Sequence, residues 1–251
     1  MSSDGRITLQ PALLLHRKPY RDTSLLIEAF SVEHGRLGLV ARGARARRGA
    51  LQGVLQPFIP LLLSWSGRGE LMTLTGAEPD GPTLALQGEV VISGFYLNEL
   101  LMRLLPRHDP QPHLYQRYLA TLHRLVHAGT DEWALRLFER DLLHELGYGL
   151  LLTHEGGSGE MVAPAVRYCY HPEFGPQRLE HGNERCLSVH GATLLALAQG
   201  EEADSRIRAE AKRLMRMSLS YYLGAKPLAS RELFRQRYAG KSAQNDNEKE
   251  E

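Results

Sequence analysis

Residues His34–Ala50 read HGRLGLVARGARARRGA. The apolar stretch Leu37–Ala41 within them is typical of a β-strand, and the remainder alternates arginine with glycine and alanine. Between Glu33 and Glu70 the chain carries six arginines and no acidic residue. Guanidinium groups match phosphate oxygens bidentately, and small residues allow a close approach. The stretch predicts a cationic loop leaving a β-sheet and suited to a polyanion. The alternative interpretation is a solvated basic loop.

Five apolar stretches separated by turn residues surround this loop, which predicts a small closed β-barrel. They are Ile7–Leu15, Leu25–Phe30, Leu37–Ala41, Val54–Leu63 and Leu71–Thr75. Pro57 and Pro60 lie inside the fourth stretch. Since proline cannot donate to a ladder, they indicate an edge, a bulge or an early end of that strand.

From about residue 88 the apolar period becomes helical. It predicts helices over residues 90–105, 112–128, 132–146, 191–198, 204–223 and 230–238. A glycine-rich segment opens an irregular hairpin region at about 155–187. We therefore expect an α+β protein with three parts: a barrel domain over residues 1–80, a helical domain over 81–241, and a disordered acidic tail over 242–251.

The net charge of +1 conceals a partition along the chain. The net charge is +3 over residues 1–80, −7 over 81–204, +8 over 205–241 and −3 over the tail. Such asymmetry favours a polyanion partner that touches two parts of the chain. With 43% hydrophobic residues, no bilayer-length apolar run, no signal peptide and only two cysteines, we expect a cytoplasmic protein without a disulfide framework.

The templates for catalysis and metal binding fail. Gly240-Lys241-Ser242 lacks the preceding glycine of a phosphate-binding loop. His123 and His127 have helical metal-ligand spacing but no third ligand nearby. Cys169 and Cys186 lack paired C-x-x-C spacing and do not make a complete zinc site. The sequence therefore favours a binding protein over an enzyme, with no cofactor.

Nine segments resemble one family in their joint order. They are residues 17–25 (RKPYRDTSL), 33–36 (EHGR), 41–45 (ARGAR), 55–58 (LQPF), 96–101 (YLNELL), 135–139 (LRLFE), 146–149 (LGYG), 211–216 (AKRLMR) and 222–231 (YLGAKPLASR). Together they resemble the RecO family of bacterial DNA repair and recombination mediators. The resemblance covers nearly the whole chain.

The resemblance implies an N-terminal OB-fold followed by a helical domain with a small zinc-finger-like hairpin. It implies a non-enzymatic, nucleoid-associated protein that binds single- and double-stranded DNA, anneals complementary strands and binds the single-stranded DNA-binding protein (SSB). With RecR, such proteins help to load RecA. Some members hold zinc through two C-x-x-C pairs. Here the first pair corresponds to Glu155 and Ser158, and only Cys186 is left of the second, so the hairpin is expected to hold together by packing instead.

Two groups of site residues follow from the charge pattern and the resemblance. The candidates for DNA binding are Arg17, Lys18, Arg21, Arg36, Arg42, Arg45, Arg47, Arg48, Lys212, Arg213, Arg216, Lys226 and Arg231. Tyr20 and Trp65 are candidates for base stacking or for the core. The candidates for binding the acidic SSB tail are Arg136, Phe138, Arg140, Arg117 and Arg124, where Arg136 matches the family's LR-x-FE segment. For Arg140 above all, the alternative is a helix-surface ion pair.

Two other functions are compatible with a basic barrel. One is an RNA-binding or translation-related OB-fold factor, which a preference for RNA would reveal. The other is a protein-interaction scaffold whose arginines are surface charge only, which would tolerate their reversal.

Overall fold

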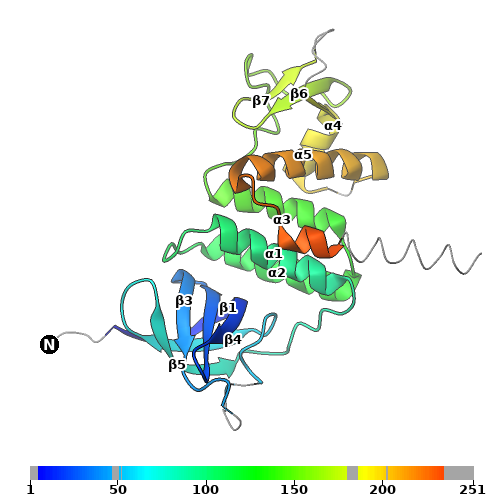
Figure 1. Cartoon of the computed structure of the whole chain (residues 1–251). Helices are drawn as coiled ribbons and strands as arrows, with labels where there is room; N and C mark the ends of the chain where they lie inside the picture. Colours follow the sequence, from blue (N-terminus) through cyan, green and yellow to red (C-terminus); the bar gives the residue numbers. More distant parts are fainter. Residues whose placement is uncertain (1–4, 47–50, 52, 180–185, 202, 235–251) are drawn as a thin grey trace, which may run out of the picture. The chain divides into compact units, whose positions relative to one another are not determined.

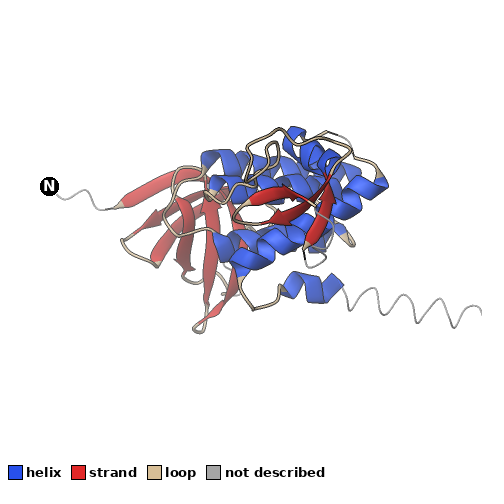
Figure 2. Ribbon diagram, turned by 90° about the horizontal axis from the view of Figure 1, so that it is seen from above, coloured by secondary structure: helices blue, strands red, loops and turns tan. Residues whose placement is uncertain are grey.

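The computed structural model describes residues 5–46, 51, 53–179, 186–201 and 203–234. These residues form two compact units (Figures 1 and 2). One unit contains the described residues up to Thr130 and again from Pro227, and the other is Asp131–Lys226. This division groups the first two helices with the barrel. The domain boundary at residue 80 stays a prediction.

The first unit contains a closed five-stranded barrel, the arrangement of an OB-fold. Its strands are β1 (Arg6–Tyr20), β2 (Ser24–Ser31), β3 (Gly35–Ala41), β4 (Leu61–Ser66) and β5 (Met72–Pro79). They follow the order β1-β2-β3-β5-β4, and the parallel pair Leu39–Met72 joins β3 to β5. The barrel predicted from the sequence is confirmed. The fourth strand begins later than expected, because Pro57 and Pro60 keep residues 54–60 out of the ladder.

The middle of the strand β1, Ala12–Leu15, is buried on both faces. Ala12 and Leu14 belong to the hydrophobic core inside the barrel. Leu13 and Leu15 point to the opposite face, as alternation along a strand requires, and are also fully buried. The continuous apolar run PALLL therefore marks the side of the barrel that other elements cover.

Two helices, α1 (Val90–Leu104) and α2 (Pro112–Ala128), complete the core of this unit. They pack against each other, and α1 packs on β1 (Figure 1). Asn98 on α1 donates from Nδ2 to the Leu15 carbonyl at 2.9 Å and accepts from the Tyr118 hydroxyl of α2. The ring of Phe30 on β2 meets Tyr115 edge-on at 5.4 Å. One buried amide thus links barrel and helices.

A carboxyl-terminal segment also belongs to the first unit. Residues 229–234 are helical, and the Glu99 carboxylate accepts bonds from the backbone N–H groups of Ala229 (2.8 Å) and Ser230 (2.9 Å). The expected continuation to residue 238 and the acidic tail lie outside the described residues. No helix within the described ranges has both the length and the hydropathy to cross a membrane.

The second unit combines three helices with a three-stranded sheet. The helices α3 (Glu132–Glu145), α4 (Gly191–Gln199) and α5 (Ser205–Leu223) pack together. Asp131 caps α3 by accepting bonds from Trp133 and Ala134, and Asp204 caps α5. The sheet order is β7-β6-β8, with β6 (Arg167–His171), β7 (Gly175–Arg178) and β8 (Leu187–His190). The expected hairpin is β6–β7, and β8 adds a third strand.

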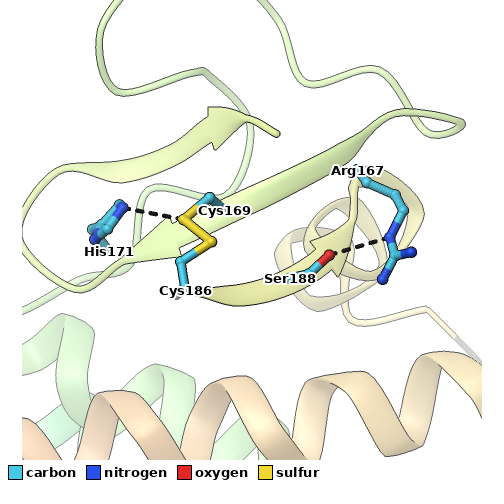
Figure 3. Close-up of a disulfide and its surroundings, with 5 residues drawn as sticks. All are labelled: Arg167, Cys169, His171, Cys186 and Ser188. Atoms are coloured by element: carbon cyan, nitrogen blue, oxygen red, sulfur yellow. Dashed lines mark hydrogen bonds between the residues drawn. A yellow bond between two sulfur atoms is a disulfide. The ribbon is translucent and has the colours of Figure 1, made fainter. Parts of the chain in front are cut away.

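A disulfide joins Cys169 to Cys186 across this small sheet (Figure 3). The antiparallel pairing of β6 with β8 sets Cys169 opposite Ser188, which brings Cys186 within bonding range. The Sγ atom of Cys169 also lies 3.2 Å from Nε2 of His171. This disulfide was not predicted from the sequence. The structure corrects this, because a third strand brings together two cysteines that are 17 residues apart.

Candidate nucleic-acid interface

One end of the barrel carries a cluster of exposed cations. The β1–β2 turn lies beside the end of β3, because Leu25 pairs with Ala41 and the Arg45 N–H donates to the Thr23 carbonyl at 2.8 Å. The exposed members of this barrel cation cluster are Arg17, Lys18, Arg21, Arg42 and Arg45. Arg47 and Arg48, the other two predicted members, lie outside the described residues. The fold thus gathers two separate sequence segments into one basic surface.

Contacts with neighbouring groups hold some of these side chains. Arg17 donates from Nη1 to the Leu55 carbonyl at 2.7 Å, which fixes one edge of its guanidinium. The guanidinium carbon of Arg21 lies 5.2 Å from the ring centre of Tyr20, within cation–π range. Side chains ordered in this way lose less entropy when they meet a phosphate.

Arg36 has a different environment from the cluster. Its guanidinium is partly buried and donates to the Met102 carbonyl near the end of α1. Burial lowers the pKa of Arg36 below its ordinary value, although Glu28 opposes the shift. This contact joins β3 to α1, so Arg36 has a structural role besides the DNA contact predicted for it.

Trp65 is a core residue. Its side chain is 2% exposed and meets His34 edge-on at 5.1 Å. Both line a cavity of about 260 Å³ at the barrel end opposite the cation cluster. Tyr20 is half-buried beneath Arg21. Trp65 therefore presents no open stacking face. Phe95 on α1 is an exposed aromatic residue that was not predicted as a stacking candidate.

The remaining DNA-binding candidates lie on the carboxyl-terminal part of the chain. Arg213 and Arg216 are exposed on α5 of the second unit. Lys212 is also exposed and forms a surface ion pair with Glu132 at 2.8 Å. Lys226 is exposed after α5. Arg231 belongs to the first unit and is half-buried directly after Ser230.

The residues predicted to bind the SSB tail fall into both units. Arg117 and Arg124 are exposed on α2 of the first unit. On α3 of the second unit, Phe138 is only 1% exposed and belongs to the core. Arg140 donates to the Leu197 carbonyl at the end of α4 and to Asp141 on its own helix.

Arg136 is the most buried of the predicted site arginines. It is 9% exposed and forms an ion pair of 2.5 Å with Glu139, which is fully buried. Its Nε atom is buried without a hydrogen-bond partner among the described residues. Arg136 thus has a structural role on α3 besides the tail contact predicted for it.

Comparison with known proteins decides the family. The family model described as Recombination protein O N terminal matches residues 6–82, and the one described as Recombination protein O C terminal matches residues 86–232. The chain belongs to the RecO family. It is 52% identical over 228 residues to the DNA repair protein RecO of Nitrosococcus oceani (91% of this chain, 93% of the relative). It is 52% identical over 232 residues to that of Methylococcus capsulatus (92% and 94%). Its role therefore lies in DNA repair and recombination.

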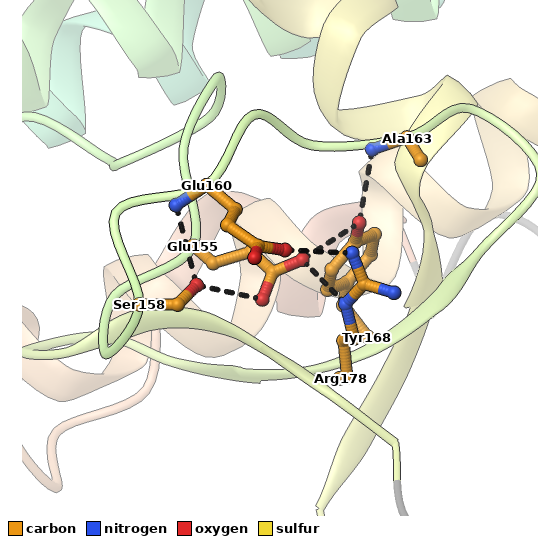
Figure 4. Close-up of polar contacts among 6 residues, drawn as sticks. All are labelled: Glu155, Ser158, Glu160, Ala163, Tyr168 and Arg178. Carbon is orange, nitrogen blue, oxygen red and sulfur yellow. Dashed lines mark hydrogen bonds and ion pairs between the residues drawn. The ribbon is translucent and has the colours of Figure 1, made fainter.

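Glu155 and Ser158, the positions expected to correspond to the first zinc-binding pair, belong to a polar network (Figure 4). Arg178 donates to Glu155 at 2.8 Å and to Glu160 at 3.0 Å, and Ser158 donates to Glu155 at 3.0 Å. Burial alone would raise the pKa of Glu155, but the bonds from Arg178 and Ser158 hold it below its ordinary value. Cys169 and Cys186 form a disulfide and so offer no thiolate, and Glu155 is already bonded to Arg178 and Ser158. The residues at this place therefore do not fit a zinc ion. No group of three or more metal-ligating side chains occurs in the described part of the chain.

Proposed function

We propose that this RecO protein is a non-enzymatic mediator that binds single- and double-stranded DNA, anneals complementary strands and binds SSB. With RecR it would promote the loading of RecA, and it would work on the nucleoid. The observation that carries the proposal is the barrel cation cluster, five exposed cations at one end of an OB-fold barrel. Barrels of this class bind single strands through basic grooves.

Annealing follows from charge neutralisation. Two complementary strands repel each other through their phosphates, and guanidinium groups at the barrel end lower that repulsion. Contacts to phosphates leave the base edges free to pair. Both binding and annealing should therefore weaken steeply as salt rises, because each phosphate contact releases counterions.

The acidic SSB tail requires cations beside an apolar surface. The match of Arg136 to the family's LR-x-FE segment supports a tail site on α3, and the exposed residues Arg117 and Arg124 offer a second basic surface on α2. Arg136→Lys keeps a charge beside Glu139 but removes the guanidinium fork. We expect this variant to bind a tail peptide more weakly, while Arg117→Ala with Arg124→Ala reports the contribution of α2.

The first experiment is the annealing of complementary oligonucleotides, naked and SSB-coated, over a series of salt concentrations. The variant Arg42→Ala/Arg45→Ala removes two members of the cluster. The matched control Arg6→Ala/Arg68→Ala removes two cations from the opposite end of the barrel. We expect the first variant to lose most annealing of naked strands and the control to keep it.

Two outcomes contradict the proposal. If the wild type neither binds nor anneals DNA at low salt, the mediator function is wrong and the scaffold interpretation takes its place. If it binds RNA of the same sequence more tightly than DNA, an RNA-binding or translation-related role is favoured.

A further inference from the structure

Phe95 is an exposed aromatic ring on α1. Its side chain is 41% exposed, while its helix neighbours Gly94 and Tyr96 are buried. It is the only aromatic residue among the large exposed hydrophobic residues of the described first unit. A single exposed apolar residue is ordinary, so its significance depends on what surrounds it.

The ring of Phe95 rests on a second aromatic ring. Phe58 meets it edge-to-face, with ring centres 5.2 Å apart and planes at 63°. Phe58 itself is fixed, because its carbonyl accepts a bond from the Leu84 N–H at 2.9 Å. A Cβ atom on Gly94 would lie 2.8 Å from Cζ of Phe58, so only glycine leaves room for this ring. Phe95 therefore projects from a filled, rigid base and holds its orientation without a ligand.

Two basic residues are linked to this ring by short contacts. Arg17 donates to the carbonyl of Leu55, which lies three residues before Phe58, a span of at most about 10 Å of chain. Glu99 lies one helical turn after Phe95 and accepts bonds from Ser230, the residue before Arg231. An exposed aromatic ring with basic residues nearby is the combination that binds the bases and phosphates of a single strand.

We propose that Phe95 is a stacking platform for an unpaired base of single-stranded DNA, with Arg17 and Arg231 contacting the flanking phosphates. This inference rests on the proposed DNA-binding function and adds an exposed aromatic ring to it, since Trp65 is buried. Bases in a duplex already stack on each other, so the ring favours single strands. An apolar side chain of a partner protein would need a pocket to enter, whereas here Phe58 packs against Phe95 and fills that space.

The test compares Phe95→Ala and Phe95→Trp with wild type by fluorescence anisotropy. Leu71→Ala, an exposed apolar residue elsewhere on the same unit, is the matched control. The ligands are a thymine oligonucleotide, an abasic strand of the same length and a duplex. We expect Phe95→Ala to bind the thymine strand about tenfold more weakly or worse, as removal of one stacking aromatic does. Binding to the abasic strand and the duplex should not change.

Further expectations sharpen the test. Phe95→Trp should bind the thymine strand about as tightly as wild type, because an aromatic ring is kept. The slope of log K against log salt concentration should be the same for Phe95→Ala and wild type, because no phosphate contact is lost. The inference is overturned if Phe95→Ala binds the thymine strand as tightly as wild type does. It is equally overturned if the substitution weakens binding of the thymine strand and of the abasic strand to the same extent. It is also overturned if only binding of an SSB-tail peptide is lost. Failure of the wild type to bind any DNA would instead contradict the proposed function itself.

Discussion

At the scale of single residues, arginines with the same charge have different environments. Arg42 and Arg45 are exposed, whereas Arg36 donates to a backbone carbonyl of α1 and Arg136 pairs with the buried Glu139. A buried guanidinium has lost its hydration, so its partner must compensate for it. Substituting such an arginine therefore tests folding and binding together, while substituting an exposed one tests binding alone.

The ion pair on α3 supports a stability prediction. Arg136→Ala should lower the free energy of unfolding of the second unit by about 3 kcal/mol, because it leaves the Glu139 carboxylate buried without its cation. The double change Arg136→Met/Glu139→Leu should cost much less, since both charges leave together. Urea unfolding in a Trp65→Phe background lets Trp133 on α3 report this unit alone.

Lys212→Ala is the matched control for this prediction. This variant breaks the ion pair with Glu132, in which both side chains are about half exposed to solvent. It should lower the free energy of unfolding by less than about 1 kcal/mol. Equal urea midpoints for Arg136→Ala and Lys212→Ala would show that burial of the α3 pair contributes nothing.

At the scale of elements, the small sheet of the second unit is closed by two links of different kinds. The disulfide joins β6 to the segment before β8, and the network around Glu155 joins Arg178 of β7 to the loop over residues 155–160. Gly156 lets this loop approach closely, because a Cβ atom there would lie 1.5 Å from the Phe174 carbonyl oxygen. The two links therefore act on both sides of the central strand β6.

The network predicts how stability responds to pH and to chelators. The pKa of Glu155 is lower in the folded protein, so its contribution is present above the pKa of the unfolded chain. That contribution is lost as pH falls through the folded pKa. Glu155→Gln should therefore lower the urea midpoint at pH 7, and its difference from wild type should shrink in acid.

The control for this prediction is the wild type with and without EDTA, whose midpoints should coincide. A midpoint that falls with the chelator, or a Glu155→Gln difference that grows in acid, would contradict the interpretation of the network.

The elements also show what the sequence could and could not predict. Helices α1 to α5 and the barrel strands could be predicted, because the regular spacing of apolar residues marks them in the sequence. The late start of β4 depends on two prolines, and β8 is only four residues long, without a periodic signal. The disulfide depends on β8 and was missed with it. The burial of Arg136 was missed because a charged residue on a helix is expected to face water.

At the scale of the whole molecule, positive charge is concentrated in two stretches of sequence. Residues 1–80 carry a net charge of +3 and residues 205–241 a net charge of +8, with a net charge of −7 between them. The fold exposes several of these cations, in the barrel cation cluster and on α5. Such a distribution steers a polyanion toward the basic surfaces and away from the acidic stretch.

The α5 cations give the last prediction. If they contact DNA, Arg213→Ala/Arg216→Ala should reduce the slope of log K against log salt for a single strand by about 1.4, since each phosphate contact contributes about 0.7. Arg42→Ala/Arg45→Ala should reduce it by a similar amount, and the combined variant by the sum, because each phosphate contact releases its own counterions. Anisotropy titrations over a salt series measure all three. A slope for Arg213→Ala/Arg216→Ala equal to that of wild type would confine the phosphate contacts to the barrel, and the strong positive charge near the carboxyl end would then serve another partner.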